Sequence, residues 1–293
     1  MDERITQQAE QLVAFVRQFE DTIVAYSGGV DSAVVAKAAQ RALGDRALAI
    51  TGVSASLAAG ELEAAQRIAA AIGIRHEALN TDELSRPEYL QNAPNRCFHC
   101  KTELYEQLGR IGKQRGIRTI LNGANTDDLG DFRPGMRAAA QHEVRSPLAE
   151  CGFDKATVRS LARHWGIEVW DKPATPCLSS RVAYGLNITP ERLARIDAAE
   201  QLLRNLGFGS VRVRLHENEL ARIETSIDSL ARLCEPRIRE AVAKQLRELG
   251  FRYVTVDLEG FRSGSFQQLV PAEQLTRFAQ TEHKRPQHSS QSS

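Results

Sequence analysis

The residues from Ser27 to Ser32 have the types and the spacing of a phosphate-binding loop. They run Ser-Gly-Gly-Val-Asp-Ser between a short apolar segment and a segment with helical periodicity. Gly28 and Gly29 allow the backbone to approach an anion, which the free N–H groups at a helix start attract. The hydroxyls of Ser27 and Ser32 can add hydrogen bonds, and Asp31 can hold a Mg²⁺ that bridges phosphates. The loop is not a Walker A motif, and the alternative interpretation is a glycine-rich turn without a ligand.

The five cysteines form the second group of residues that could bind a metal or act as nucleophiles. The N-terminus, MDERITQQAE, lacks the pattern of a signal peptide, so a cytoplasmic location is expected. There, an odd number of unevenly spaced cysteines favours reactive or metal-binding thiols over disulfides. Cys97 and Cys100 form a C-x-x-C, whereas Cys151 and Cys234 have no partner motif and are interpreted as structural.

The composition excludes two classes of protein. No apolar run approaches the roughly 18 residues that a membrane-spanning helix needs, so a membrane protein is not expected. The chain of 293 residues carries 38 basic and 37 acidic side chains, for a net charge of +1. This balance argues against a protein held on nucleic acid mainly by its overall charge.

The order of periodic segments predicts an α/β fold with a doubly wound parallel sheet, because apolar strands alternate with helices of ordinary length. The expected strands are residues 22–26, 47–53, 76–79, 119–122 and 167–170. The expected helices are residues 3–19, 31–41, 60–72, 98–115 and 154–165, the last with Asp154 as its N-cap. Residues 1–188 are assigned to this first domain.

A smaller α/β domain is predicted for residues 189–281, followed by a disordered polar tail at 282–293. Its expected helices are residues 190–206 and 236–249, and its expected strands are residues 211–215, 220–225 and 253–258. The alternation in the first of these strands, VRVRL, places Arg212 and Arg214 on one face. Two arginines side by side suit a phosphate. The alternative is a strand face on which they pair with Glu217 or Glu224.

Polar residues follow the fourth expected strand, at the sheet edge where ligands of doubly wound folds bind. Asn125, Asp127 and Asp128 lie there. Asp128 is a candidate for a second Mg²⁺ contact and Asn125 is expected near the nucleotide. A capped turn is the alternative, since Asn and Asp also favour such bends.

The phosphate loop resembles that of the PP-loop ATP pyrophosphatases. The resemblance implies cleavage of ATP between the α- and β-phosphates, attachment of AMP to a substrate oxygen, and its displacement by nitrogen or sulfur. Further segments, taken in order over roughly residues 10–265, resemble the LarE family of ATP-dependent sulfur transferases. These segments are NRCFHCK (95–101), NGANTDDLGDFRPG (122–135), VRSPLAE (144–150), WDKPATPCLSSR (170–181) and VRVRLHENELARIE (211–224).

The LarE resemblance implies a substrate and a set of site residues. The substrate would be pyridinium-3,5-biscarboxylic acid mononucleotide, whose carboxylates become thiocarboxylates in nickel-pincer nucleotide biosynthesis. Cys177 matches the sulfur-donating cysteine, and Arg181 is expected to lower the pKa of that thiol if the loop folds back. The resemblance implies that Arg212 and Arg214 hold the phosphate of the substrate. Lys101, which follows the C-x-x-C, is expected to offset the charge of a cluster or an adenylate. Other matching positions near that pocket are Ser180, Glu200 and Glu224; Asp131 and Arg133 match without an assigned role. A homo-oligomer is also implied.

The C-x-x-C is a departure from the best-known LarE form, in which a single cysteine surrenders its sulfur. With Cys177, the pair Cys97 and Cys100 supplies three thiolates, one short of the four ligands typical of a [4Fe–4S] cluster. The family members with three such cysteines suggest a cluster whose remaining iron binds and delivers a sulfide. The alternatives are half of a zinc site, with His99 as a possible ligand, or a redox pair beside a sacrificial Cys177.

Two further hypotheses compete with this function. A tRNA thiolase also joins a PP-loop to three cysteines, but the neutral charge and the lack of a basic extension disfavour it. A non-catalytic ATP-binding or sulfur-carrier protein is the second. An amidotransferase is disfavoured because no glutaminase domain fits in this length.

Overall fold

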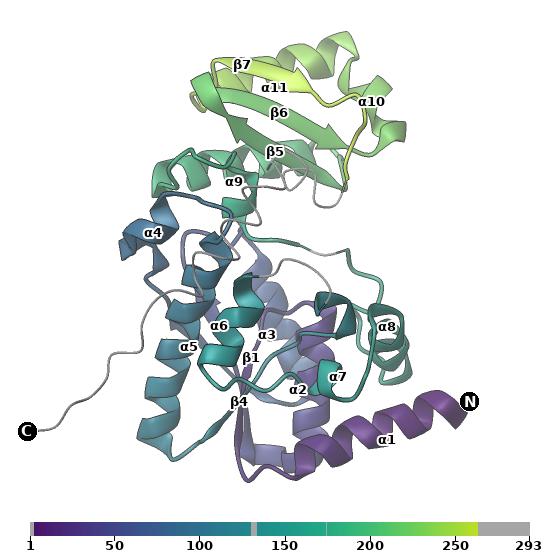
Figure 1. Cartoon of the computed structure of the whole chain (residues 1–293). Helices are drawn as coiled ribbons and strands as arrows, with labels where there is room; N and C mark the ends of the chain where they lie inside the picture. The colour runs from purple at the N-terminus through teal and green to yellow at the C-terminus, as the bar shows by residue number, and fades with distance from the viewer. Residues whose placement is uncertain (1–2, 130–133, 174, 263–293) are drawn as a thin grey trace, which may run out of the picture.

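The structure is a computed structural model that describes residues 3–129, 134–173 and 175–262 (Figure 1). The predicted tail at 282–293, Asp131 and Arg133 lie outside the described residues. The chain forms a four-stranded parallel sheet of order β3-β2-β1-β4 and a separate three-stranded sheet. The strands of the parallel sheet are β1 (Thr22–Ala25), β2 (Ala47–Val53), β3 (Arg75–Asn80) and β4 (Thr119–Leu121). The predicted doubly wound α/β fold is confirmed.

Helices cover both faces of the parallel sheet, because alternate strand residues point to opposite sides. Val24 and Ala49 face the core formed with α1, α2, α3 and α8, whereas Ile23 and Leu48 face the core formed with α5 and α6. The helices of this part are α1 (Glu3–Arg17), α2 (Val30–Leu43), α3 (Glu61–Ile72), α4 (Pro87–Leu90), α5 (Arg96–Arg115), α6 (Pro134–Gln141), α7 (Pro147–Glu150) and α8 (Lys155–His164). Short 3-10 turns add Gly44–Arg46, Glu83–Ser85, Thr126–Asp128 and Leu178–Arg181.

The strand predicted at residues 167–170 is wrong. This segment forms turns after α8, although Ile167 and Val169 are buried against the α1, α2 and α8 core. The β4 edge that a further strand would occupy is instead paired by a bridge from Leu121 to Arg145. The Asn122 N–H donates to the Arg145 carbonyl at 2.9 Å, and the Arg145 N–H donates to the Ile120 carbonyl at 2.9 Å. Burial therefore explains the apolar alternation of 167–170 without a strand.

The second sheet has the order β5-β6-β7, with β5 antiparallel to β6 and β6 parallel to β7. Its elements are α9 (Pro190–Asn205), β5 (Val211–His216), the 3-10 turn Glu217–Glu219, β6 (Leu220–Thr225), α10 (Ile227–Leu233), α11 (Pro236–Glu248) and β7 (Tyr253–Val256). Its core also takes in Leu178 and Ile188, and Ala58 and Tyr89 from the first half of the chain. The domain boundary at residue 188 stays a prediction.

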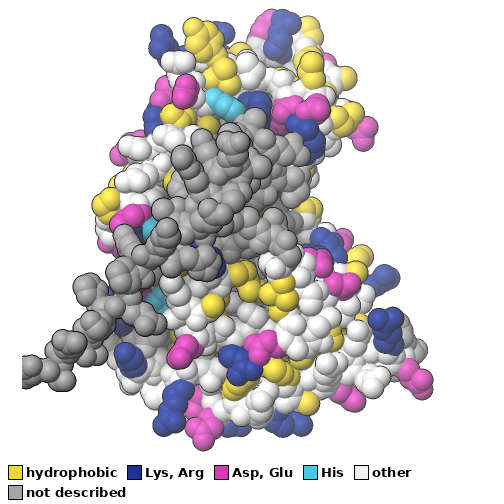
Figure 2. Space-filling view, in the orientation of Figure 1, with side chains coloured by type: hydrophobic (Ala, Val, Ile, Leu, Met, Phe, Trp, Pro, Cys, Tyr) yellow, Lys and Arg dark blue, Asp and Glu magenta, His cyan; other side chains and the backbone are white. Residues whose placement is uncertain are grey.

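Charges of both signs are interspersed on the face drawn in Figure 2. In the described part of the chain, no helix is both long and apolar enough to cross a membrane.

Gly123, directly after β4, lies against the start of α2. A Cβ added there would lie 2.7 Å from the backbone nitrogen of Ser32 and 2.9 Å from the carbonyl carbon of Asp31. Because both are backbone atoms, Gly123→Ala is expected to lower the free energy of unfolding by about 1–3 kcal/mol. Urea unfolding measures this. Gly109→Ala in α5, where an added Cβ meets nothing within 4 Å, is the control and should be neutral or stabilising. Equal stability of the two variants would contradict the close approach.

Candidate active site

The phosphate loop links β1 to α2, as the sequence predicted. Ser32 Oγ accepts a hydrogen bond from the backbone N–H of Ser27 at 3.2 Å and donates to the Gly29 carbonyl at 3.1 Å. The two serine hydroxyls are 3.2 Å apart. Gly28 has φ +69, and a Cβ there would lie 2.9 Å from Cβ of Ala65, so only glycine fits. The loop is held in shape by its own serines, at the carboxyl end of the sheet.

Asp31 extends from the first turn of α2 toward the loop that follows β4. Its Oδ1 accepts a hydrogen bond from Nδ2 of Asn125 at 3.0 Å, and its Oδ2 lies 2.5 Å from Nζ of Lys155. The structure therefore brings Asp31 and Asn125 together. Both carboxylate oxygens of Asp31 already have nitrogen donors.

Asp128 forms a capping box with Asn125, the local alternative that the sequence left open. The Asn125 N–H donates to Oδ2 of Asp128 at 3.0 Å, and the Asp127 N–H donates to Oδ1 of Asn125 at 3.0 Å. A Mg²⁺ contact by Asp128 stays a prediction. The box orients the Asn125 side chain toward Asp31.

Lys155 is a site residue that the sequence analysis missed. It occupies the first position of α8, after the predicted N-cap Asp154, whose side chain accepts from the Thr157 N–H at 2.8 Å. A helix start disfavours a cation, because the helix dipole is positive there. The position of Lys155 directly after an N-cap aspartate was therefore a feature of the sequence that favoured a partner for its ammonium outside α8.

The C-x-x-C opens α5, and Cys177 directly precedes the 3-10 turn 178–181. Cys97 is exposed, whereas Cys100 and Cys177 are half-buried. Burial raises the pKa of the Cys100 thiol, and the nearby charges of Glu83 and Cys177 raise it further. The three thiols therefore share one neighbourhood. Within the described residues, however, no three His, Cys, Asp or Glu side chains are arranged to hold a metal ion.

The Cys177 loop docks on the carboxyl end of the parallel sheet, as the phosphate loop does. The Leu178 N–H donates to the Ser56 carbonyl, just after β2, at 2.8 Å. Ser56 Oγ donates in turn to Oε1 of Glu83 at 3.0 Å, and Glu83 is 2% exposed. The candidate sulfur donor and the candidate nucleotide site therefore lie at the same edge of the sheet.

Arg96, immediately before Cys97, joins the C-x-x-C helix to the Cys177 loop. Its Nη1 donates to the Ser179 carbonyl at 2.8 Å and to Oδ1 of Asn92 at 2.5 Å. The Tyr89 hydroxyl lies 2.6 Å from Ser179 Oγ. Burial opposes the charge of Arg96, but the neighbouring thiols Cys97 and Cys177 raise its pKa overall. No local pattern predicts the contacts of this guanidinium, because its partner Ser179 is 83 residues away.

Lys101 follows the C-x-x-C in α5. Burial lowers the pKa of its ammonium, but Tyr105 and the thiols of Cys100, Cys97 and Cys177 outweigh burial and raise it. This position suits the predicted role of offsetting negative charge beside the thiols, which stays a prediction.

Arg181 and Glu200 form an ion pair in which neither side chain is exposed to solvent. Nε of Arg181 donates to Oε1 of Glu200 at 2.9 Å, and Nη1 donates to the Cys177 carbonyl at 2.9 Å and to the Pro176 carbonyl. Arg181 also donates to Ser180 Oγ at 3.0 Å. The loop does fold back, which was the condition for Arg181 to act on the thiol, but the bonds to Pro176 and Cys177 go to backbone oxygens. Arg181 thereby fixes the Cys177 backbone.

Arg212 and Arg214 share one face of β5, as predicted. Nη2 of Arg214 donates to Oε2 of Glu224 at 2.9 Å, the pairing that the sequence left as an alternative. Nη1 of Arg214 donates to the Ser180 carbonyl at 2.9 Å, which ties this face to the Cys177 loop. Burial lowers the pKa of Arg212 to about 10, and the charges of Arg181, Arg214 and Arg204 also oppose its protonation. The region is thus strongly positive.

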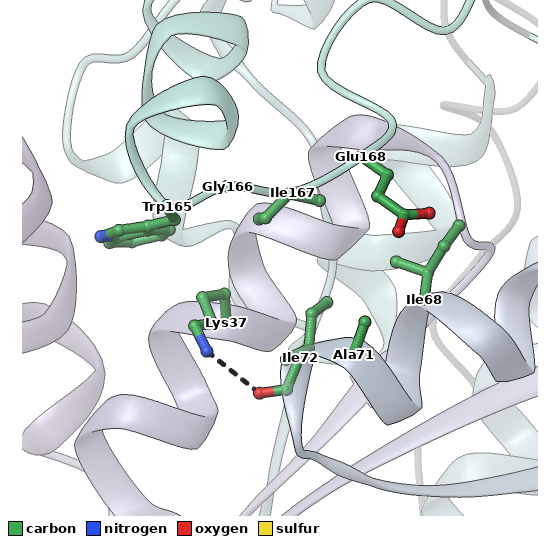
Figure 3. Close-up of a pocket in the computed structure, with 8 residues that line it drawn as sticks. All are labelled: Lys37, Ile68, Ala71, Ile72, Trp165, Gly166, Ile167 and Glu168. Atoms are coloured by element: carbon green, nitrogen blue, oxygen red, sulfur yellow. Dashed lines mark hydrogen bonds between the residues drawn. The ribbon is translucent and has the colours of Figure 1, made fainter.

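The pocket in Figure 3 lies away from these residues, between α2, α3 and the turn after α8. Lys37 borders it and donates from Nζ to the Ile72 carbonyl at 3.1 Å. None of the predicted site residues lines this pocket. Of the two remaining cysteines, Cys151 packs against the first core and Cys234 is exposed.

Comparisons with known proteins cover up to 92% of this chain. Residues 3–99 match the family described as NAD synthase. An uncharacterised protein of Synechocystis is 44% identical over 89% of this chain and 97% of its own length. The pyridinium-3,5-bisthiocarboxylic acid mononucleotide synthase of Lactiplantibacillus plantarum is 38% identical over 92% of this chain and 96% of its own length. A tRNA-specific 2-thiouridylase of Wolbachia is 26% identical over 52% of this chain and 51% of its own.

Proposed function

We infer that this chain, which belongs to the LarE family of ATP-dependent sulfur-transferring enzymes, thiolates the carboxylates of pyridinium-3,5-biscarboxylic acid mononucleotide. A substrate carboxylate oxygen attacks the α-phosphorus of ATP, and pyrophosphate leaves. A sulfur nucleophile then attacks the acyl carbon, and AMP leaves with the substrate oxygen. The product is a thiocarboxylate. The observation that supports this proposal is that the Cys177 loop, like the phosphate loop, lies at the carboxyl end of the parallel sheet, where Arg214 of the arginine-rich face donates to the Ser180 carbonyl.

The nucleotide would bind at the loop between β1 and α2. Backbone N–H groups at the start of α2 and the hydroxyls of Ser27 and Ser32 suit its phosphates. The Asp31 carboxylate is the oxygen ligand that Mg²⁺ prefers, and it lies beside the loop. We propose Asp31, with Asp128 as a second contact, as the residues that hold the magnesium ion, whose charge would neutralise the leaving pyrophosphate.

The mononucleotide phosphate would bind at the arginine-rich face of β5. Arg212 and Arg214 lie there with Arg181 and Arg204 near them, against the carboxylates of Glu200 and Glu224. Burial is the main cause that lowers the pKa of Arg212 to about 10, and the charges of Arg181, Arg214 and Arg204 lower it further against the opposing charge of Glu200. A phosphate dianion would relieve that repulsion.

The sulfur would come through Cys177, with Cys97 and Cys100 beside it. We propose that the three thiolates hold a [4Fe–4S] cluster, since their residue types suit it and the charges of all three act on the same ammonium, that of Lys101. When bound, such a cluster supplies a sulfide at the iron that lacks a cysteine. Because the described thiols do not form a preassembled metal site, sacrifice of the Cys177 sulfur is the second candidate route.

Pyrophosphate release tests the proposed function. The protein, MgATP and the biscarboxylate mononucleotide should give pyrophosphate, AMP and thiocarboxylate, and no release would favour a non-catalytic ATP-binding protein. Iron and acid-labile sulfide of anaerobically purified protein, with intact mass before and after turnover, decide the sulfur route. About four irons and an unchanged mass support the cluster. Iron-free protein that loses the mass of H₂S establishes the sacrificial route.

The tRNA thiolase hypothesis has less support. The thiouridylase relative aligns with only 52% of this chain, whereas the mononucleotide synthase relative aligns with 92% of it. The small-molecule substrate is therefore the one we propose.

A further inference from the structure

We propose that Glu83 is a positioning residue for sulfur transfer: its buried carboxylate fixes the loop after β2, and this loop in turn fixes the chain on either side of Cys177. Glu83 begins the 3-10 turn Glu83–Ser85, which follows β3. The inference rests on the proposed function for the reaction that is affected. The placement of the Cys177 loop by Glu83 does not depend on that function.

The carboxylate of Glu83 holds two serines of the loop after β2, here called the β2–α3 loop (residues 54–60). Oε1 of Glu83 accepts a hydrogen bond from Ser54 Oγ at 2.5 Å and another from Ser56 Oγ at 3.0 Å. Ser54 Oγ also accepts from the Ser56 N–H at 3.1 Å. One buried oxygen therefore fixes both hydroxyls and the backbone between them.

The β2–α3 loop and the first residue of α3 hold the chain on both sides of Cys177. After Cys177, the Leu178 N–H donates to the Ser56 carbonyl at 2.8 Å. Before Cys177, Nζ of Lys172 donates to Oε2 of Glu61 at 2.9 Å. Because the Ser56 carbonyl belongs to the loop that the buried carboxylate fixes, a movement of that loop would also move Cys177.

Glu83 lies close to the thiols. Leu84, the next residue, and Cys100 both pack against the core that contains Leu178 and Tyr89. The negative charge of Glu83 raises the pKa of the Cys100 thiol, after the larger effect of burial. The β2–α3 loop is therefore fixed beside the residues from which the sulfur is expected to come.

Protein stability alone does not explain why this buried acceptor is a carboxylate. Glu83 is 2% exposed, and within the described part of the chain its Oε2 is buried without a hydrogen-bond partner. Burying a charge that is incompletely hydrogen-bonded lowers the stability of the folded state. A glutamine would avoid that cost, but it would accept the two hydroxyls more weakly, because hydrogen bonds to a charged oxygen are about twice as strong. A firmly held loop therefore accounts for the carboxylate.

Hydrogen exchange and separate assays of the two half-reactions test the proposal on variants of the full chain. Glu83→Met removes the acceptor at a similar side-chain size, and Glu83→Gln keeps an acceptor oxygen without its charge. Ser56→Ala is a milder change, which removes one hydroxyl and keeps the carbonyl that holds Leu178. Glu248→Met is the matched control, because the Glu248 side chain is 63% exposed on α11. Thermal unfolding checks that each variant is folded, and Glu83→Gln should melt no lower than the wild type.

In Glu83→Met, the Leu178 amide should exchange at least about tenfold faster, because its acceptor is no longer held in place. The kcat of thiocarboxylate formation should fall at least about tenfold, whereas pyrophosphate release and the KM for ATP should change by less than about threefold. Glu83→Gln should stay within about threefold of the wild type in each measurement. Ser56→Ala should change exchange and thiocarboxylate formation in the same direction as Glu83→Met, by a smaller factor, and Glu248→Met should equal the wild type.

Unchanged exchange at Leu178 in folded Glu83→Met would overturn the proposal, as would an equal loss of pyrophosphate release and thiocarboxylate formation. A Glu83→Gln variant as impaired as Glu83→Met would also overturn it. Wild-type protein that releases no pyrophosphate would end the proposed function. Faster exchange at Leu178 in Glu83→Met, restored in Glu83→Gln, would still leave the placement of the Cys177 loop by Glu83 standing.

Discussion

Replacing Cys177 by serine should abolish thiocarboxylate formation while pyrophosphate release continues. Serine supplies neither a thiolate ligand for the proposed cluster nor a sulfur atom for the sacrificial route, so the transfer rate should fall by about a thousandfold or more. Folding should be preserved, because Arg181 and Leu178 hold this loop through backbone atoms that the substitution leaves in place. Parallel assays of pyrophosphate and of thiocarboxylate, by mass spectrometry, separate the two half-reactions.

Cys234→Ser is the matched control, because Cys234 is exposed and outside the site. Its rates in both assays should equal those of the wild type. If Cys177→Ser still forms thiocarboxylate at an undiminished rate, the sulfur passes through another group, and both proposed routes fail.

The second large effect is expected at the buried ion pair of Arg181 and Glu200. Glu200→Gln would leave the guanidinium of Arg181 buried without its carboxylate. Breaking such a pair from one side costs about 3–5 kcal/mol of unfolding free energy. Because Arg181 also holds the carbonyl of Cys177, sulfur transfer should fall even at temperatures where the variant is folded. Urea unfolding and the thiocarboxylate assay measure the two effects.

Glu248→Gln supplies the control for the same chemical change. Glu248 pairs with Lys244 at 3.9 Å on the exposed side of α11. Its loss should alter stability by less than about 0.5 kcal/mol. Equal stability of the Glu200 and Glu248 variants would contradict the role of the buried pair.

Local patterns were sufficient to predict most of the fold. The helix that became α3, predicted at 60–72, is found at Glu61–Ile72, and the strand that became β2 is found at its predicted bounds, 47–53. The helix has the period of one buried face, and the strand is a continuous apolar run because both of its faces are covered. The segment 167–170 failed because burial alone satisfies Ile167 and Val169, while Arg145 pairs the sheet edge. An alternation of apolar residues indicates that the segment is buried, but it does not show whether the segment pairs with a strand of the sheet.

The candidate site was predictable where the chemistry is local. The phosphate loop needs only adjacent residues, and Arg212 and Arg214 needed only strand alternation. Lys155 reaches Asp31 across 124 positions, and Arg96 reaches Ser179 across 83. Such pairs depend on how α5 and α8 pack around the sheet, which no short window of sequence encodes. The contacts of Arg181 were also not predictable from local sequence. Its Nε is taken by the buried carboxylate of Glu200, and its Nη1 donates to the Cys177 carbonyl.

Ala58 and Tyr89 belong to the first half of the chain but fill the core around α9 and β5. The two sheets should therefore melt in a single transition, because separating them would expose Tyr89, which is 1% accessible to solvent. A fragment ending at residue 188 would carry this apolar surface uncovered and should aggregate. For the same reason, the part of the chain from α9 to β7 could not be replaced by the corresponding part of another protein, because its core includes Ala58 and Tyr89.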